Sequence, residues 1–252
     1  MSEAAPGPLA GVTVVVTRPR SQAASLVAEL EAADATARSI PVIEIVEPVD
    51  NGAALANEMA SLVAGDWLVV TSPNGAQRVA DRHAQHPLAD GVQIAAVGPA
   101  TKDRAEAGGL AVDLIPQTAI AEGLLDAFPP LPEGGATVLL ARAEVARKTL
   151  PEDLARRGWN VVELAAYRTV LVDITDQQRV DCRDADAVIF TSGSTVEGLV
   201  GAVGVDGLPD VTVSIGPATT AVAERLGVTI GVEATEHTIA GAVRALAARL
   251  QP

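Results

Sequence analysis

The sequence repeats part of itself. Residues 96–109 are AVGPATKDRAEAGG, and residues 214–227 are SIGPATTAVAERLG. When 97–109 is aligned with 215–227, seven of thirteen positions are identical. Self-similarity at a fixed spacing indicates that one structural unit has been duplicated, and this limits the folds that the chain can adopt.

The repeat extends over most of the chain. Three further pairs match in the same order: GVTVVVTR at 11–18 with GATVLLAR at 135–142, TSPNG at 71–75 with TSGST at 191–195, and TAIAEGLL at 118–125 with HTIAGAV at 237–243. The offset between the copies stays between 118 and 124 positions. We therefore predict a tandem duplication of a five-stranded α/β unit.

Short apolar, β-branched runs alternate with helical stretches throughout the sequence. The runs predicted to be strands are 12–17, 67–71, 92–97, 110–115, 136–141, 160–165, 187–191, 211–215 and 227–232. This alternation predicts α/β structure with parallel sheets. Aromatic residues make up only 2% of the chain, so Ala, Val, Leu and Ile must form the core, as suits sheets that are covered by helices.

The repeat alone leaves two packing arrangements open. Each copy could form its own domain, or strands 1 and 2 of the first copy could join strands 3 to 5 of the second. PVIEIVEPVD at 41–50 and YRTVLVDIT at 167–175 each follow the second strand of a copy and lack helical periodicity. A pair of antiparallel connectors between two domains would have this pattern.

Charge and composition exclude several classes of function. The formal net charge of −14 argues against nucleic-acid binding, which selects basic faces. An anionic small molecule stays possible, because charges beyond a Debye length of ~8 Å are largely screened. The single cysteine, Cys182, rules out an internal disulfide framework and is interpreted as incidental. No apolar run approaches the ~18 residues of a membrane span, so a cytoplasmic protein is expected.

The repeated motifs lie where a strand ends and a helix begins. Ser72, Gly98 and Gly216 each precede a proline, which is typical of a helix N-cap followed by the first helical residue. Ligands of open parallel sheets bind outside the carboxyl ends of the strands, where helix N-termini offer unpaired N–H groups to anions. Two sets of such loops predict a site for a ligand with many carboxylates.

Other polar residues lie at the same loop ends. The hydroxyl residues are Thr71, Ser72, Thr101, Thr191, Ser192, Ser194 and Thr219. Capping explains any one of them, but their repetition in both copies favours binding. Arg18 and Arg142 occupy equivalent places after the first strand of each copy. A cation there opposes the helix macrodipole, so the pair either has a function or points into solvent.

Several chemistries are not indicated. The phosphate-binding patterns G-x-x-x-x-G-K-[ST] and G-x-G-x-x-G are absent, as is the nucleophile pattern G-x-S-x-G. His83, His86 and His237 have no neighbours at metal-ligand spacing, so no metal and no cofactor is expected. Arg20, Arg147 and Lys148, taken singly, are interpreted as solvated charges. Tyr167, the only tyrosine, either packs as a buried wedge or donates a hydrogen bond in a cleft.

Together these motifs resemble the uroporphyrinogen-III synthase family over nearly the whole chain. The resemblance rests on VTRP (16–19), VTSPNGA (70–76), AVGPAT (96–101), RAEVARKTL through RGWNVVELAAYRT (142–169), IFTSGST (189–195) and SIGPAT (214–219). Pro73 departs from the family, which often has a small residue such as Ala there. Proline preserves the cap but removes one N–H donor.

The resemblance implies two similar parallel-sheet, flavodoxin-like domains that are joined by a two-strand connector, which is the arrangement with exchanged halves. Domain one would comprise 1–40 and 174–252, the inserted domain two would comprise 49–166, and the connectors would be 41–48 and 167–173. The substrate would bind in the cleft between the domains of a monomer.

The resemblance also implies a cofactor-free lyase of porphyrin and haem biosynthesis. Its substrate is hydroxymethylbilane, a linear tetrapyrrole with eight carboxylates, and hydroxymethylbilane synthase, which makes it, is a candidate partner. Loss of the hydroxyl as water gives an azafulvene, which the substituted carbon of ring D attacks. The spiro intermediate then breaks and recloses, so that ring D is inverted in uroporphyrinogen III. Without enzyme, the substrate closes to the symmetric isomer I.

The resemblance assigns candidate roles to particular residues. Tyr167 would assist departure of the hydroxyl. Carboxylates or pyrroles would be bound by Arg18, Thr71, Ser72, Gly98, Thr101, Arg142, Arg147, Thr191, Ser192, Gly216 and Thr219. The alternative is a non-catalytic module that binds or senses a tetrapyrrole or another polyanion on the same scaffold. A sugar- or nucleotide-modifying enzyme is a third alternative, and its phosphate-loop and metal signatures are missing.

Overall fold

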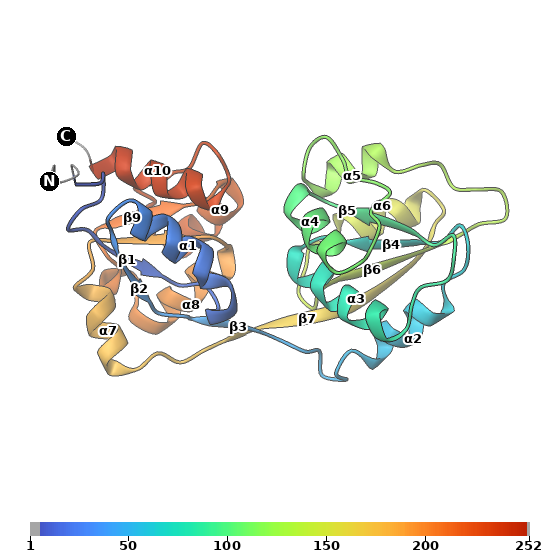
Figure 1. The fold of residues 1–252 in the computed structure, drawn as a ribbon, viewed down its shortest axis with the longest axis horizontal. Coiled ribbons are helices and arrows are strands. Elements are labelled where there is room, and N and C mark those ends of the chain that lie inside the picture. The colour runs from blue at the N-terminus through green and yellow to red at the C-terminus, as the bar shows by residue number, and fades with distance from the viewer. Residues whose placement is uncertain (1–5, 251–252) are drawn as a thin grey trace, which may run out of the picture. The chain divides into compact units, whose positions relative to one another are not determined.

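The computed structural model describes residues 6–250, and the chain divides into two compact units (Figure 1). The first unit consists of the described residues up to Glu44 together with those from Val170 onward. The second unit is Ile45–Thr169. Within residues 6–250, no helix is long and apolar enough to cross a membrane.

The first unit is built on a parallel five-stranded sheet with the order β10-β9-β8-β1-β2. Its strands are β1 (Thr13–Val16), β2 (Thr36–Ser39), β8 (Ala187–Phe190), β9 (Val211–Ser214) and β10 (Val232–Glu233). Its helices are α1 (Arg20–Ala32), α7 (Asp176–Arg183), α8 (Gly193–Val203), α9 (Pro217–Arg225) and α10 (Ile239–Leu250), with a 3-10 turn at Val205–Gly207.

Successive side chains of β1 enter opposite cores, as the period of two along a strand requires. Val14 and Val16 pack with residues of α1 and α10, such as Leu26 and Leu246. Val15 packs on the other face with residues of α7, α8 and α9, such as Leu199 of α8. The sheet is therefore covered by helices on both faces, which explains the near-continuous apolar runs of its central strands.

The second unit has a sheet with the order β3-β7-β6-β4-β5. Its strands are β3 (Ile43–Val46), β4 (Trp67–Val70), β5 (Gln93–Ala96), β6 (Thr137–Ala143) and β7 (Asn160–Leu171). Its helices are α2 (Ala53–Ser61), α3 (Pro73–Gln85), α4 (Pro99–Ala107), α5 (Ala121–Ala127) and α6 (Thr149–Arg156). The pairs β4–β5, β4–β6 and β6–β7 are parallel.

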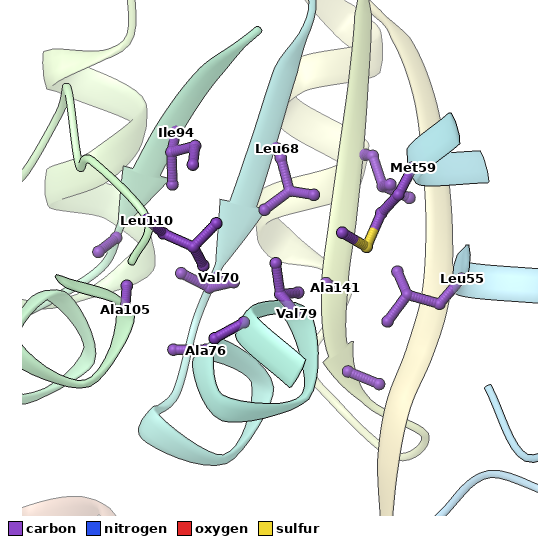
Figure 2. Close-up of a cluster of buried hydrophobic side chains, with 14 of the residues drawn as sticks. Leu55, Met59, Leu68, Val70, Ala76, Val79, Ile94, Ala105, Leu110 and Ala141 are labelled. Carbon is purple, nitrogen blue, oxygen red and sulfur yellow. The ribbon is translucent and has the colours of Figure 1, made fainter. Parts of the chain in front are cut away.

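Two cores again cover the two faces of the sheet. Figure 2 shows the first, where Leu68 and Val70 of β4 lie with Leu55 and Met59 of α2 and with Val79 of α3. The opposite core, under α5 and α6, holds an aromatic cluster. In that cluster the ring centroid of Phe128 lies 4.9 Å from that of Trp67 and 5.2 Å from that of Trp159.

The predicted exchange of halves is confirmed. Strands β1 and β2 of the first copy share a sheet with β8, β9 and β10 of the second copy, and β4 and β5 share a sheet with β6 and β7. The chain passes from the first unit to the second in β3 and returns in β7, and these two strands are hydrogen-bonded neighbours. Each sheet is therefore assembled from both copies of the repeat.

Two predicted strands differ from the structure, and one observed strand was not predicted. In the run 110–115, only Leu114 forms an isolated bridge, to Ala95, because the side chain of Asp113 occupies the N–H of Ile94 at 2.8 Å. The run 227–232 contributes only the start of β10; before it, the N–H of Gly231 is shared between the carbonyl oxygen of Thr212 at 2.9 Å and its Oγ1 at 3.0 Å. The edge strand β2 was not among the predicted runs, since its sequence, TARS, has no apolar run.

The two copies also share a close backbone contact at one glycine each. In each copy a glycine in the last helix contacts a carbonyl oxygen five residues earlier. A Cβ atom added to Gly123 would lie 2.2 Å from the oxygen of Thr118, and one added to Gly241 would lie 2.1 Å from that of Glu236. No side chain fits at either position, so both copies require glycine to seat this helix on its preceding loop.

Candidate functional site

Ser72 is the N-cap of α3. Its backbone is extended, and its Oγ accepts the N–H of Gly75 at 3.2 Å. A Cβ atom at Gly75 would lie 3.0 Å from the carbonyl oxygen of Ala141, so the first turn of α3 packs closely on β6. The cap thus fixes a hydroxyl at the carboxyl end of β4, as the sequence predicts.

Tyr167 contacts this cap directly. Its hydroxyl lies 3.0 Å from Ser72 Oγ, and its ring belongs to the core around β4 and α3, with 7% of its surface exposed. The ring is therefore a buried wedge, as one alternative states, and the hydroxyl makes a hydrogen bond with Ser72, while donation in a cleft stays a prediction. The candidate catalytic residue and one candidate binding residue lie in contact.

Arg142 lies near the end of β6 and does not point into solvent. Only 7% of its side chain is exposed. Its Nη1 lies 3.2 Å from Glu163 Oε2 on β7, and its Nη2 donates to the carbonyl of Arg147. Lys148 lies 3.1 Å from the other oxygen of the same carboxylate. Burial lowers the pKa of Arg142 and the charge of Glu163 opposes this shift, so the guanidinium is held by a neutralising partner.

A pocket of about 270 Å³ lies beside Arg142. Its lining includes Thr71, Val97, Ile120, Arg142, Arg147 and Thr149. Three of these residues belong to the predicted binding set: Thr71 directly follows β4, Arg142 lies near the end of β6, and Arg147 lies in the loop after β6. Ile120 is half exposed, so the pocket combines cationic groups with an apolar wall.

The helices after β5 and β9 begin without a side-chain cap. Gly98 is the N-cap of α4 and Gly216 is the N-cap of α9, and because glycine has no side chain, these caps offer no acceptor to the first-turn N–H groups. Thr101 and Thr219, at equivalent places in these first turns, are buried, with 5% and 4% of their surface exposed. Both copies therefore keep the same helix start, in separate units.

Arg18 follows β1 in the first unit and is half-buried. Its Nε is buried and has no hydrogen-bond partner, and the Oγ1 of the neighbouring Thr17 is also buried without one. Burial lowers the pKa of Arg18. This arginine is therefore partly desolvated, and no compensating carboxylate pairs with it among the described residues.

Ser192 caps α8 in the first unit, as Ser72 caps α3 in the second. Its Oγ accepts the N–H of Thr195 at 3.4 Å and lies 3.0 Å from the hydroxyl of Ser194. Thr191 is partly buried just before it. The first unit itself contains no tyrosine, because the only one in the chain, Tyr167, belongs to the second unit. The two serine caps are thus equivalent in position but differ in their surroundings.

The predicted residues thus form one set in each unit. In the second unit they follow β4, β5 and β6, except that Arg142 lies near the end of β6 itself and Tyr167 lies within β7. In the first unit they follow β1, β8 and β9. Because the carboxyl ends of parallel strands share one edge of a sheet, each set lies along the edge where ligands of such folds bind. Within residues 6–250, no group of three or more His, Cys, Asp and Glu side chains could hold a metal ion.

Comparison with known proteins identifies the family. The family model described as uroporphyrinogen-III synthase HemD matches residues 24–244. The chain belongs to the uroporphyrinogen-III synthase family. A protein of Synechococcus elongatus named uroporphyrinogen-III synthase is 32% identical over 95% of this chain and 96% of its own length. A Chlorobaculum parvum protein of the same name is 31% identical over 87% of this chain and 92% of its own.

A solved structure of this family has the same fold. The mutant uroporphyrinogen III synthase of Thermus thermophilus matches 96% of this chain and 99% of its own length, with a TM-score of 0.67 and 19% identity. The two structures are thus similar although only 19% of the aligned residues are identical. It confirms the fold of two parallel-sheet units with exchanged halves.

Two neighbours of the predicted residues were missed. Glu163 pairs with Arg142. In the sequence, however, a single Glu within a strand indicates only a position on an exposed face of the sheet. His237 was assigned to the surface, and it is exposed, yet its ring is so close to Gly216 that an added Cβ atom would lie 3.0 Å from it. The repeat could have indicated this contact, because Ala119 approaches Gly98 in the same way.

Proposed function

We propose that this chain catalyses the closure of hydroxymethylbilane to uroporphyrinogen III, with loss of water and inversion of ring D. Family membership across residues 24–244 supports this activity. The observation that supports a role for particular residues is the contact between Tyr167 and Ser72. This contact places a phenol hydroxyl beside the loop at the carboxyl end of β4. The equivalent cap of the first unit, Ser192, contacts the hydroxyl of Ser194 in place of a phenol.

The substrate carboxylates would be held by loops of both copies. Four helix starts, those of α3, α4, α8 and α9, present N–H groups and hydroxyls at strand ends. An anion at a helix N-terminus gains about 0.3–1 kcal/mol per contact. Several such contacts would fix one conformation of a flexible chain of four pyrroles, which is the orientational task that the reaction sets.

Ser72 would set the direction of the Tyr167 proton. The Oγ of Ser72 already accepts the N–H of Gly75, and its own proton can be donated to the phenol oxygen. The phenol proton of Tyr167 would then be free for the leaving hydroxyl of the substrate. The carbon–oxygen bond breaks as the pyrrole supplies electrons, and the oxygen departs as water once it has taken a proton.

The proposal also includes the setting of the reaction. Because free hydroxymethylbilane closes spontaneously to isomer I, we expect the enzyme to receive its substrate soon after hydroxymethylbilane synthase releases it. A cytoplasmic monomer suffices for this task. Co-sedimentation of the two enzymes would measure whether transfer requires a complex.

The direct test is incubation with freshly made hydroxymethylbilane, followed by oxidation and chromatographic separation of the isomers. Uroporphyrin III in excess over the control without protein would establish the activity. Isomer I at the uncatalysed rate would overturn it. If the protein then still bound the octacarboxylate uroporphyrin III, the non-catalytic binding module would replace the synthase.

A further inference from the structure

The repeated arginines Arg18 and Arg142 have diverged in function. We infer that Arg18 provides the uncompensated positive charge for a substrate carboxylate, whereas Arg142 is neutralised by Glu163 and fixes the segment 144–148. The identity of the carboxylate rests on the proposed function. The division of roles between the arginines follows from aligning the two copies of the repeat and comparing the residues that surround each arginine.

The register between the copies is fixed by strand pairing. Val16 of β1 pairs with Ser39 of β2, and Leu140 of β6 pairs with Glu163 of β7. Both members of the second pair lie 124 positions after those of the first, the same offset that separates Arg18 from Arg142. Ser39 therefore occupies in the first unit the place that Glu163 occupies in the second.

The second unit neutralises its arginine. Glu163 contacts Arg142 at 3.2 Å and Lys148 at 3.1 Å, so one carboxylate serves two cations. Arg142 also donates to the carbonyl of Arg147. Because these contacts are made inside the protein, the positive charge of the Arg142 guanidinium is already balanced, and fewer of its N–H groups are free to bind a ligand.

The segment that Arg142 fixes is helical in the other copy. Residues 20–24 form the first turn of α1, while the equivalent residues 144–148 precede α6, which begins only at Thr149. Besides the bond from Arg142 to the carbonyl of Arg147, the N–H of Glu144 donates to the carbonyl of Tyr167 at 3.0 Å. These two bonds hold the segment away from the helical conformation that its counterpart adopts.

The first unit leaves its arginine uncompensated. Ser39 has no charge to offer, no carboxylate of the described residues forms an ion pair with Arg18, and its buried Nε makes no hydrogen bond. Desolvating a guanidinium without a partner is unfavourable. On a protein with a net charge of −14, carboxylates of this chain could have supplied that partner. A bound anion would supply it instead, and a local cost of this kind is expected at functional sites.

The test exchanges the two positions. Binding of uroporphyrin III, the oxidised product with eight carboxylates, is measured by fluorescence titration for Arg18→Gln, Ser39→Glu, Ser39→Gln and Glu163→Gln. We expect Arg18→Gln to raise Kd by about 10- to 100-fold, the range for a hydrogen bond between charged groups. Ser39→Glu should raise Kd similarly although it keeps Arg18, whereas the neutral Ser39→Gln should change it less than about twofold.

Glu163→Gln should act in the opposite direction and lower Kd, because it uncovers the charges of Arg142 and Lys148. The inference is overturned if Arg18→Gln leaves Kd unchanged, if Ser39→Glu binds as well as Ser39→Gln, or if Glu163→Gln does not strengthen binding. Circular dichroism of each variant separates these results from unfolding.

The two proposals fail separately. Wild-type protein that yields only isomer I, but whose variants follow the expected order of Kd values, would remove the synthase activity and retain the assignment of Arg18. Wild-type protein that makes isomer III, with Kd values insensitive to position 18, would retain the activity and remove the assignment.

Discussion

The hydrogen bond between Ser72 and Tyr167 can be measured by a double-mutant cycle. Ser72→Ala removes both the cap on Gly75 and the contact with the Tyr167 hydroxyl at 3.0 Å. Loss of a serine cap costs about 1 kcal/mol, and loss of a buried hydrogen bond costs about 1 kcal/mol more. We therefore expect the free energy of unfolding of the second unit to fall by about 2 kcal/mol.

Tyr167→Phe keeps the buried ring and removes only the hydroxyl, so it should cost about 1 kcal/mol. The double variant should also cost about 2 kcal/mol rather than 3, because the same hydrogen bond is lost in both single variants. The expected coupling energy is thus about 1 kcal/mol.

Urea unfolding followed by tryptophan fluorescence is the suitable assay. Both tryptophans of the chain, Trp67 and Trp159, lie in the second unit, so the signal reports on that unit. Equal m-values across the four proteins would show that the same surface unfolds in each. Free energies that add to within about 0.4 kcal/mol would refute the hydrogen bond.

The same four proteins test the proposed role in catalysis. If the Tyr167 proton stabilises the leaving hydroxyl, Tyr167→Phe should slow formation of isomer III by about 10- to 100-fold, as expected for a hydrogen bond to a group that develops charge. Ser72→Ala should have a smaller effect in wild type and none in the Tyr167→Phe background. An unchanged rate for Tyr167→Phe would remove Tyr167 from the mechanism.

Two further predictions concern the packing of the repeat and the cysteine. Gly241→Ala and Gly123→Ala should each destabilise their own unit by about 1–3 kcal/mol, since the added methyl group meets a carbonyl oxygen. Gly201→Ala should instead stabilise the first unit by about 0.5–1 kcal/mol, because there is open space around Gly201 in α8. Equal shifts in melting temperature for all three variants would contradict this prediction. Burial raises the pKa of Cys182 from 9.0 to about 11, so a thiol reagent at pH 8 should label it only after denaturation. Stability should be insensitive to this thiol below about pH 9 and fall between pH 9 and 11, where only the unfolded form releases the proton.

The sequence predicted the fold well because duplicated motifs and apolar runs carry its main determinants. The exchange of halves could be weighed from the two connectors, 41–50 and 167–175, which lack helical periodicity. The edge strand β2 was not predicted, because edge strands can be polar and a run such as TARS has no pattern that distinguishes it from a loop. The run 110–115 failed for the opposite reason, since an apolar pattern does not show that Asp113 binds the backbone of β5.

The helix starts in the candidate site were predictable from the sequence, but the side-chain contacts around them were not. The loop ends after parallel strands located Ser72, Gly98 and Gly216 correctly, because helix caps have a local signature. The contact between Ser72 and Tyr167 spans 95 positions, and no single sequence reveals a side-chain contact at that separation. For the same reason the repeat made Arg18 and Arg142 look identical, although, of the two, only Arg142 forms an ion pair with a carboxylate among residues 6–250.

The exchange of strands sets the order in which the protein can be completed during its synthesis. Thr13 hydrogen-bonds to Asp186, 173 positions later in the chain, so the sheet that begins at the N-terminus must wait for the C-terminal segment. The inserted unit can close its sheet while residues after β7 are still on the ribosome. Strand β1 can pair early with β2, but its other neighbour, β8, is synthesised only after the inserted unit, so that edge of the apolar strand needs protection for most of the synthesis.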